Sequence, residues 1–163
     1  MIGCCVFGLF AACSEDSTGP VEQQAFTGIL ETSRQCQIIG GDTTDFQPRP
    51  LSVGAVPTNY SLIAACPNPT STNTSIKFQI PQPDSVWLLV FDRPGGPAID
   101  TLFNRAANAG VYSVQWVHDG PDGVYRVVMG TASGFESYGD VQFDQYGTPA
   151  SSPAARTAPL PRE

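Results

Sequence analysis

The residues best suited to chemistry, apart from the cysteines, lie in one short run, WVHDGPDGVY. This run contains the single histidine of the chain, His118, together with Asp119 and Asp122. A general-base histidine needs a nucleophile and an orienting group beside it, and a calcium loop needs regularly spaced acids with a distal glutamate. Neither pattern is present, and a lone histidine excludes a multi-histidine zinc site. We therefore expect a surface turn here, with no catalytic residues, no metal and no cofactor.

Cysteines are the other reactive residues, and they occur at positions 4, 5, 13, 36 and 66. Cys13 ends the uncharged stretch MIGCCVFGLFAAC and is followed by the polar SEDSTGP. An apolar stretch of this length is too short to span a bilayer but is typical of the core of an export signal. Because Ala11 and Ala12 precede Cys13, the stretch resembles the lipobox of bacterial lipoproteins. It departs from that pattern at Phe10, where an aliphatic residue is preferred, and in having no Lys or Arg before Cys13.

The lipobox resemblance implies that residues 1–12 are a signal peptide and that Cys13 carries a lipid after cleavage. Two or three acyl chains, at roughly 0.8 kcal/mol per buried methylene, would hold the protein durably to a membrane. Ser14 stands where an inner-membrane retention signal carries Asp, which implies an outer-membrane or cell-surface location. The alternative is an ordinary signal peptide cleaved near Ala12, which would leave Cys13 as a free thiol.

Cys36 and Cys66 remain when the signal and the lipidated cysteine are set aside. In an exported protein such a pair predicts a disulfide, because the compartment is oxidising. Closing the loop between them would stabilise the fold by roughly 3–4 kcal/mol. The alternative is a pair of buried free thiols.

Composition limits the fold and the partners. The 163 residues are enough for one domain, and 16 glycines with 15 prolines favour short strands and turns over long helices. The net charge is −7 and the eight basic residues are scattered, which argues against a nucleic-acid partner. Nothing in the sequence indicates a small-molecule substrate.

Short apolar segments bounded by Gly, Pro, Asn or Asp recur along the second half of the chain and predict an antiparallel sandwich. The predicted strands are 75–80, 85–92, 98–104, 111–117, 124–130 and 135–143. Residues 13–24 lack apolar periodicity and predict a flexible tether, and 144–163 predict a disordered Pro/Ala-rich tail. Between the tether and the sandwich, residues 25–55 predict an N-terminal extension that packs on it, with up to two short strands.

A family resemblance supports the same fold. PNP at residues 67–69, a Ser/Thr run into strand 75–80, and the later IPQP, VFDRPG and DGVY motifs occur in order. This series resembles the Ig-like module shared by the flagellar hook-capping protein and the C-terminal sorting domain of type IX secretion cargo. The resemblance covers residues 56–143 and implies a small all-β, Ig-like β-sandwich of about 6–8 strands with disordered termini.

Segment 85–92 is apolar on both faces. The residues expected to face the core are Val86, Leu88 and Val90. A second apolar row, formed by Trp87, Leu89 and Phe91, then points away from the core, and such a row on a solvent face would be an interaction patch. The alternative is that residues 25–55 lie across this row, held there by the Cys36–Cys66 disulfide.

These patterns predict a non-enzymatic, lipid-anchored cell-envelope protein that presents an Ig-like domain for structural or adhesive interaction. Its expected partners are the membrane, through the lipid, and an envelope protein. The alternative is a type IX sorting domain on a short cargo, recognised by the secretion machinery. About twenty residues follow Phe143, whereas sorting domains end close to their last strand, and this difference counts against the alternative.

Overall fold

The computed structural model describes residues 24–26, 28–46 and 56–145, and these residues form nine strands and no helix. The strands are β1 (Leu30–Thr32), β2 (Ile38–Gly41), β3 (Ser61–Cys66), β4 (Asn73–Ile80), β5 (Asp84–Phe91), β6 (Asp100–Ala107), β7 (Gly110–Val117), β8 (Gly123–Thr131) and β9 (Glu136–Phe143). The predicted signal, Cys13, and most of the predicted tether and tail lie outside the described residues. Within the described part there is accordingly no helix that could cross a membrane.

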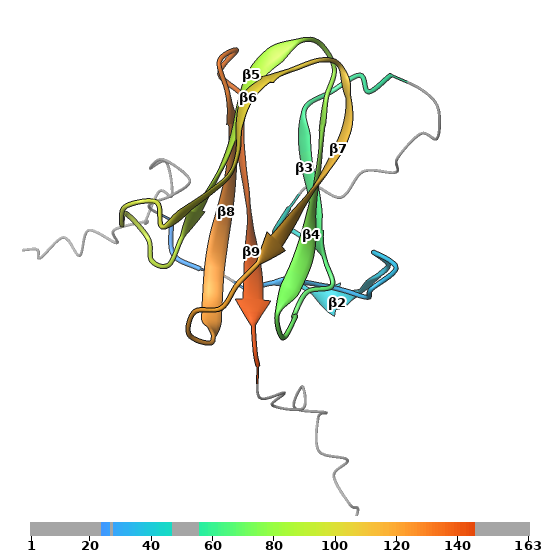
Figure 1. The fold of residues 1–163 in the computed structure, drawn as a ribbon. Coiled ribbons are helices and arrows are strands. Elements are labelled where there is room, and N and C mark those ends of the chain that lie inside the picture. The colour runs from blue at the N-terminus through green and yellow to red at the C-terminus, as the bar shows by residue number, and fades with distance from the viewer. Residues whose placement is uncertain (1–23, 27, 47–55, 146–163) are drawn as a thin grey trace, which may run out of the picture.

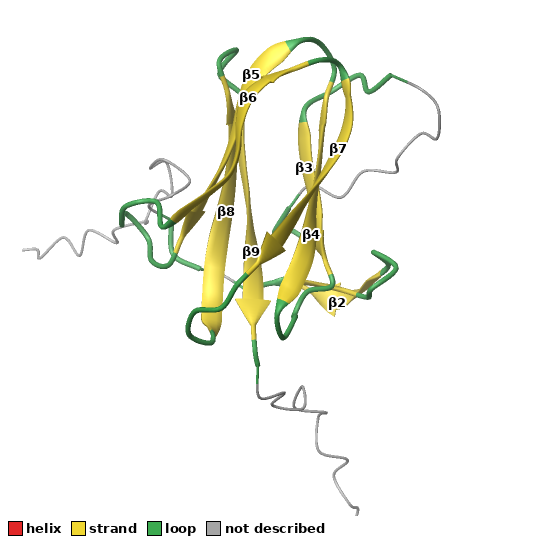
Figure 2. Ribbon diagram, in the orientation of Figure 1, coloured by secondary structure: helices red, strands yellow, loops and turns green. Residues whose placement is uncertain are grey.

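Two antiparallel sheets packed face to face form the molecule (Figures 1 and 2). One sheet has the order β3-β4-β7, and the other has the order β6-β5-β8-β9. Three hairpins, β3–β4, β5–β6 and β8–β9, stay within a sheet, and the chain crosses between the sheets after β4, β6 and β7. The predicted antiparallel sandwich is thus confirmed, with seven strands in the sandwich and a separate β1–β2 hairpin beside it.

Alternation along the strands builds the core as the sequence predicted. In β4 the side chains of Ile76, Phe78 and Ile80 are fully buried, and the intervening Lys77 is only half-buried. The three residues of β5 predicted to face the core, Val86, Leu88 and Val90, are also fully buried. Each such side chain contributes roughly 1.5–3 kcal/mol on burial, so these two central strands stabilise much of the sandwich.

Strand β3 shows no alternation, so the sequence pattern did not predict it. All six of its residues are buried. Leu62 and Ala65 belong to the main core, whereas Ile63, Ala64 and Cys66 form a second, small apolar cluster with Cys36 packed against it. A strand covered on both faces reads as a continuous apolar run, which periodicity alone cannot distinguish from other buried segments.

Strand β6 begins and ends later than predicted, at Asp100–Ala107 in place of 98–104. Its register against β5 shifts between Leu88 and Leu89, and the pairing then continues to Asp84 opposite Ala107. The last residues of β6 are polar or small and mostly exposed, so they carry no apolar pattern by which the sequence could have extended the strand.

Candidate functional site

The sandwich has two long sides at which edge strands of the two sheets face each other. On one side the edge strands are β3 and β9, and residues 28–46 contact both of them. We call this the closed side. On the other side the edge strands are β6 and β7, and no strand among the described residues pairs with their outer edges. We call this the open side.

The predicted disulfide is present on the closed side. Cys36 lies in the turn between β1 and β2 with a positive φ of 61°, and it is bonded to Cys66 at the end of β3 with a Cα–Cα distance of 5.1 Å. Its sulfur packs with Ile63 and Ala64 on the outer face of β3. The disulfide therefore fixes the β1–β2 hairpin to the edge strand that it covers.

Asn68, between the two prolines of the PNP motif, is a second attachment of the closed side. Its side chain is fully buried, and its amide nitrogen donates to the carbonyls of Leu30 at 3.0 Å and Asp140 at 2.9 Å. Its amide oxygen accepts the backbone N–H of Gln142 at 2.9 Å, and its backbone pairs with Thr32. One side chain thus joins β1 to β9, a role that the sequence analysis did not assign.

A buried ion pair lies near this attachment. Arg126 of β8 and Asp140 of β9 are both fully buried and form a two-bond fork, with nitrogen–oxygen distances of 2.8 and 2.7 Å. Arg126 also donates to the carbonyls of Gln24 at 2.6 Å and Ala25 at 3.1 Å, and its guanidinium lies 4.1 Å from the ring centroid of Tyr138. The polar atoms of this pair find their partners inside the protein. The bonds from Arg126 to Gln24 and Ala25 attach the N-terminal segment to the sheet.

Asp45 completes the polar attachments of the closed side. Its buried carboxyl accepts the backbone N–H of Leu30 at 3.1 Å and that of Asp140 at 2.8 and 2.9 Å. Burial first, and repulsion from the Asp140 carboxylate second, raise the pKa of Asp45 to about 7. Burial also raises the pKa of Asp140, against the opposing effect of its bonds to Arg126.

Phe46, next in the chain, fills the core between the sheets. It is 2% exposed, and its ring occupies the space above Gly139, where a Cβ would overlap it. The backbone of Phe46 has φ of 57°, a left-handed conformation that is unfavourable for a bulky residue and is held here by core packing. With Leu30, which is fully buried, Phe46 shows that residues 28–46 contribute to the core itself.

The apolar row of β5 is only partly accessible. Trp87 and Leu89 are half-buried and Phe91 is 7% exposed. The indole of Trp87 lies over Gly130, its neighbour on β8, so that a Cβ at Gly130 would overlap it. Of the predicted covering segment, residues 28–46 lie at β3 and β9 instead of over this row, and residues 47–55 lie outside the described part of the chain. Gln24 and Ala25 bond to Arg126, which pairs with Phe91.

His118 takes part in an aromatic corner. Its ring centroid lies 4.4 Å from that of Tyr125 and 4.6 Å from that of Phe143, and Trp116 packs against the same group. Its Nε2 lies 2.9 Å from the Tyr125 hydroxyl and 3.1 Å from the Pro121 carbonyl oxygen. Burial raises the pKa of Tyr125, so its hydroxyl stays protonated and donates to Pro121 at 2.6 Å. These bonds hold the turn between β7 and β8 in its conformation.

The two acids predicted to lie in this turn do not converge on the histidine to form a site. Asp122 accepts the backbone N–H of Gln145 at 2.9 Å, and Asp119 is exposed. In the described part of the chain, no group of three or more His, Cys, Asp or Glu residues could hold a metal ion.

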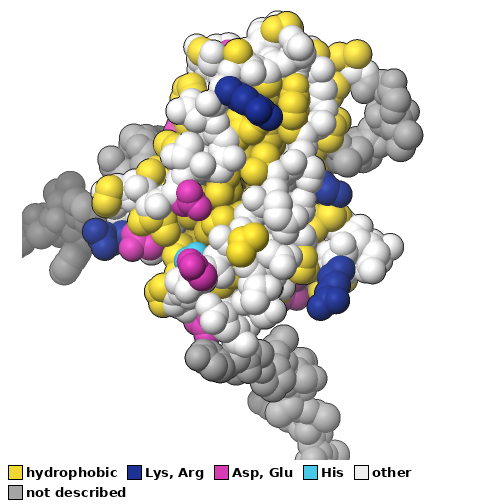
Figure 3. Space-filling model, in the orientation of Figure 1, with side chains coloured by type: hydrophobic (Ala, Val, Ile, Leu, Met, Phe, Trp, Pro, Cys, Tyr) yellow, Lys and Arg dark blue, Asp and Glu magenta, His cyan; other side chains and the backbone are white. Residues whose placement is uncertain are grey.

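A shallow groove of about 420 Å³ runs along the open side, between β6 and β7. Apolar atoms of Leu102, Phe103 and Val114 line it, and the guanidinium of Arg105 lies 4.7 Å from the centroid of the Phe103 ring. Figure 3 shows this face as an apolar stripe between two polar ridges, with a basic side chain across its upper end. The groove is thus the place where the core of the sandwich reaches the surface.

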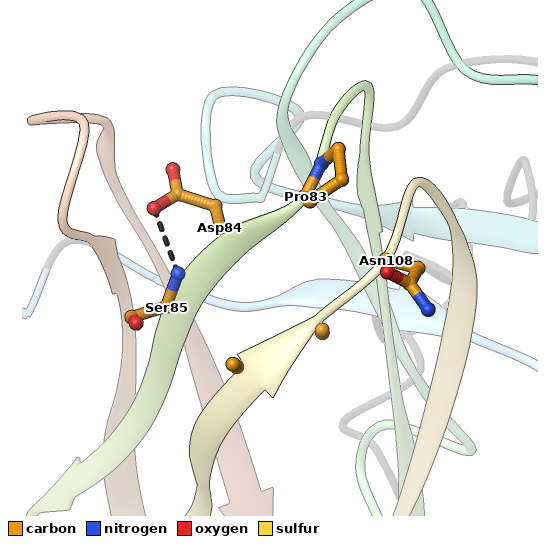
Figure 4. Close-up of a pocket in the computed structure, with 6 residues that line it drawn as sticks. Pro83, Asp84, Ser85 and Asn108 are labelled. Carbon is orange, nitrogen blue, oxygen red and sulfur yellow. Dashed lines mark hydrogen bonds between the residues drawn. The ribbon is translucent and has the colours of Figure 1, made fainter.

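A second hollow, of about 360 Å³, lies where the β4–β5 and β6–β7 turns meet (Figure 4). Its one charged side chain, Asp84, bonds to the backbone N–H of Ser85 at 2.8 Å and to the Tyr60 hydroxyl at 2.8 Å. The Ser133 hydroxyl first, and the Tyr60 hydroxyl second, lower the pKa of Asp84. The carboxylate is therefore engaged by its own neighbours.

No protein-family model, curated protein or solved structure matches this chain. The candidate functional surface therefore rests on geometry: a closed side held by covalent and polar attachments, and an open side that presents two strand edges and a groove in which an apolar stripe lies between polar side chains.

Proposed function

We propose that this chain is an exported, non-enzymatic protein that is anchored by a lipid on Cys13 to the outer membrane or cell surface. It presents its sandwich there for structural or adhesive contact with another protein. No cofactor and no nucleic acid take part in this function.

The observation that supports the proposal most strongly is the Cys36–Cys66 disulfide. A structural disulfide persists in oxidising compartments and is rare where thiols are kept reduced. It agrees with the export signal that the residues before Cys13 resemble. It also lies on one side of the sandwich and leaves the strand edges of the other side accessible, where another chain could add a strand.

The intact mass of the native protein from a membrane fraction tests the proposal. The expected result is the mass of residues 13–163 plus acyl groups, less two hydrogen atoms for the disulfide. A Cys13→Ala variant should lose both the acyl mass and the membrane association. A Cys4→Ala variant is the matched control, because that cysteine lies within the predicted signal and should change neither.

Two other results would contradict the proposal. A soluble product that begins at residue 13 without added mass would indicate an ordinary signal peptide. A secreted product that ends near residue 55 would indicate that the sandwich is removed during export, as the type IX sorting alternative requires.

A further inference from the structure

Four edge strands bound the two sheets, and three of them are protected against pairing with another chain. Strands β3 and β9 are covered by residues 28–46 on the closed side. Strand β6 carries Asp100 and Arg105 and has a register shift in its pairing with β5. Charged residues, irregular pairing and covering segments are the ordinary means by which proteins prevent edge-to-edge association.

Among the described residues, strand β7 has none of these protections. Its sequence, GVYSVQWV, contains no charged residue and no proline. All eight residues pair with β4 without a register shift, so the strand is regular along its whole length. A long, regular, uncharged edge is a template for a further strand.

The charge of the surrounding sheet favours a partner that is itself acidic overall. The chain has a net charge of −7, yet strands β3, β4 and β7 together contain one charged residue, Lys77, and no acid. The acidic residues within the sandwich strands all belong to the other sheet: Asp84, Asp100, Glu136 and Asp140. A second copy that approached along β7 would therefore meet no acid of the first copy in that sheet.

Two exposed valines on β7 fit the same partner. Val111 is 46% exposed and Val117 is 68% exposed, and both point outward on the same face at opposite ends of the strand. Two antiparallel copies of one strand bring opposite ends together, so each valine would meet an apolar residue of the other copy. Cross-strand pairs of β-branched residues of this kind stabilise a sheet.

We propose that β7 pairs with β7 of a second copy of this chain, in antiparallel order across a twofold axis. The two three-stranded sheets then become one sheet of six strands. This interaction goes beyond the proposed function and holds whether or not Cys13 carries a lipid.

Geometry fixes the register of this pairing. A twofold axis between antiparallel strands is perpendicular to the sheet, so outward residues of one copy lie opposite outward residues of the other. Directly opposed residues must then be separated by an even number of positions. Two registers satisfy this condition equally well, one centred on Ser113 and one centred on Val114, because each pairs all but one residue of β7. The exposed valines select the second register, in which Val114 lies opposite itself and Val111 lies opposite Val117. The second copy also covers the side of the open groove that β7 forms.

Cysteine cross-linking of the full chain tests this register. Directly opposed Cα atoms in a sheet are about 4.5–5.5 Å apart, within the range that a disulfide spans. A Val114→Cys variant should therefore form a disulfide-linked dimer under mild oxidation, well above the level of the parent chain, which has every other cysteine. Ser113→Cys is the register control and should cross-link much less, because its opposed residue is Gln115. Dimers formed equally by both variants, or by neither, would overturn the proposed pairing.

Sedimentation of the full chain in mild detergent gives a second, independent measurement. The parent should associate as a dimer, and Val117→Lys should weaken the association about tenfold, because it replaces two apolar cross-strand pairs. Val56→Lys is the matched control, since Val56 is 66% exposed and lies outside every strand, and it should leave association unchanged. A parent that stays monomeric, or a dimer that Val117→Lys does not weaken, would contradict the proposal.

Discussion

The closed and open sides belong to one sandwich, but different interactions hold their edge strands in place. On the closed side, a disulfide, a buried asparagine and a buried ion pair connect residues far apart in the sequence. On the open side, β6 and β7 are held by strand pairing within their own sheets and by ring packing across the core, as between Phe103 and Tyr112, and the groove between them is partly exposed. Two core residues of the closed side, Leu30 and Phe46, come from outside the seven sandwich strands.

This difference separates stability from association. Substitutions on the closed side remove buried partners, so their cost should appear in the free energy of unfolding. Substitutions on the open side remove little that is buried within one copy. Their effect should appear in the binding of a second copy, while the fold remains intact.

The largest expected effect is at the buried ion pair. Replacing Arg126 by Met leaves the Asp140 carboxyl buried without its partner and should lower the free energy of unfolding by about 3–5 kcal/mol. Arg105→Met on the open side is the matched control, because that arginine is exposed and its cation–π contact contributes under about 1 kcal/mol. Urea denaturation measures both variants. Equal losses at the two positions would remove the distinction between the sides.

Removing the disulfide should have the next largest effect. A double Cys36→Ala, Cys66→Ala variant loses the constraint on the unfolded chain and should be about 3 kcal/mol less stable than the oxidised parent. The reduced parent chain serves as the control and should be destabilised by a similar amount. Dimer formation through β7 should survive in the folded fraction of both, because the disulfide lies on the opposite side. Loss of the dimer without loss of stability would argue against this separation.

Stability should also depend on pH through Asp45. Its pKa is about 7 in the folded protein, whereas an aspartate in the unfolded chain has a pKa of 3.8. Between these pH values the folded protein therefore retains a proton that the unfolded chain releases. This contribution is fully present below about pH 4 and is lost as the pH rises through 7. The free energy of unfolding should fall by roughly 2–3 kcal/mol between pH 5 and pH 8, most of it below pH 7.5.

An Asp45→Asn variant should flatten this part of the pH profile. Its amide oxygen can take the place of the oxygen that accepts from both Leu30 and Asp140, so the fold should be retained. Denaturation curves at several pH values provide the measurement. A decline of unchanged size in the variant would assign the pH dependence to other groups, of which Asp140 is the nearest.

The smallest expected effect on stability is at the open side. Val117→Lys changes a residue that is 68% exposed, so the free energy of unfolding of the isolated copy should stay within about 0.5 kcal/mol of the parent value. The measurement requires dilution to a concentration at which the parent is monomeric. A loss as large as that of the disulfide variant would mean that β7 is needed for folding as well as for association.

Most of the sandwich could be predicted because alternation and turn residues are local signals. All six predicted strands are present, and the residues expected to face the core in β4 and β5 do so. Strand β3 was missed because both of its faces are covered, one of them by Cys36. The end of β6 was missed because its pairing with β5, rather than its own apolar pattern, determines where the strand stops.

The attachments of the closed side could be predicted only in part. Two cysteines that follow a predicted export signal indicate a disulfide, and the structure contains it. Nothing local distinguishes Asn68 from other turn asparagines, or Asp45 from other loop acids. Their roles depend on the backbone of β9, which follows about seventy or more residues later in the chain.

The sequence by itself determined an all-β antiparallel sandwich and the core faces of its central strands, and it indicated the disulfide between Cys36 and Cys66. These follow from two-residue periodicity and turn residues, which can be read from a few neighbouring positions, and from the number of cysteines in the chain. Only the tertiary structure decided that Phe46 enters the core over Gly139, that Arg126 and Asp140 hold the N-terminal segment, and that β7 remains the unprotected edge. Each of these depends on which elements pack together in the folded protein, because that packing determines how far a side chain is buried and which residues it contacts.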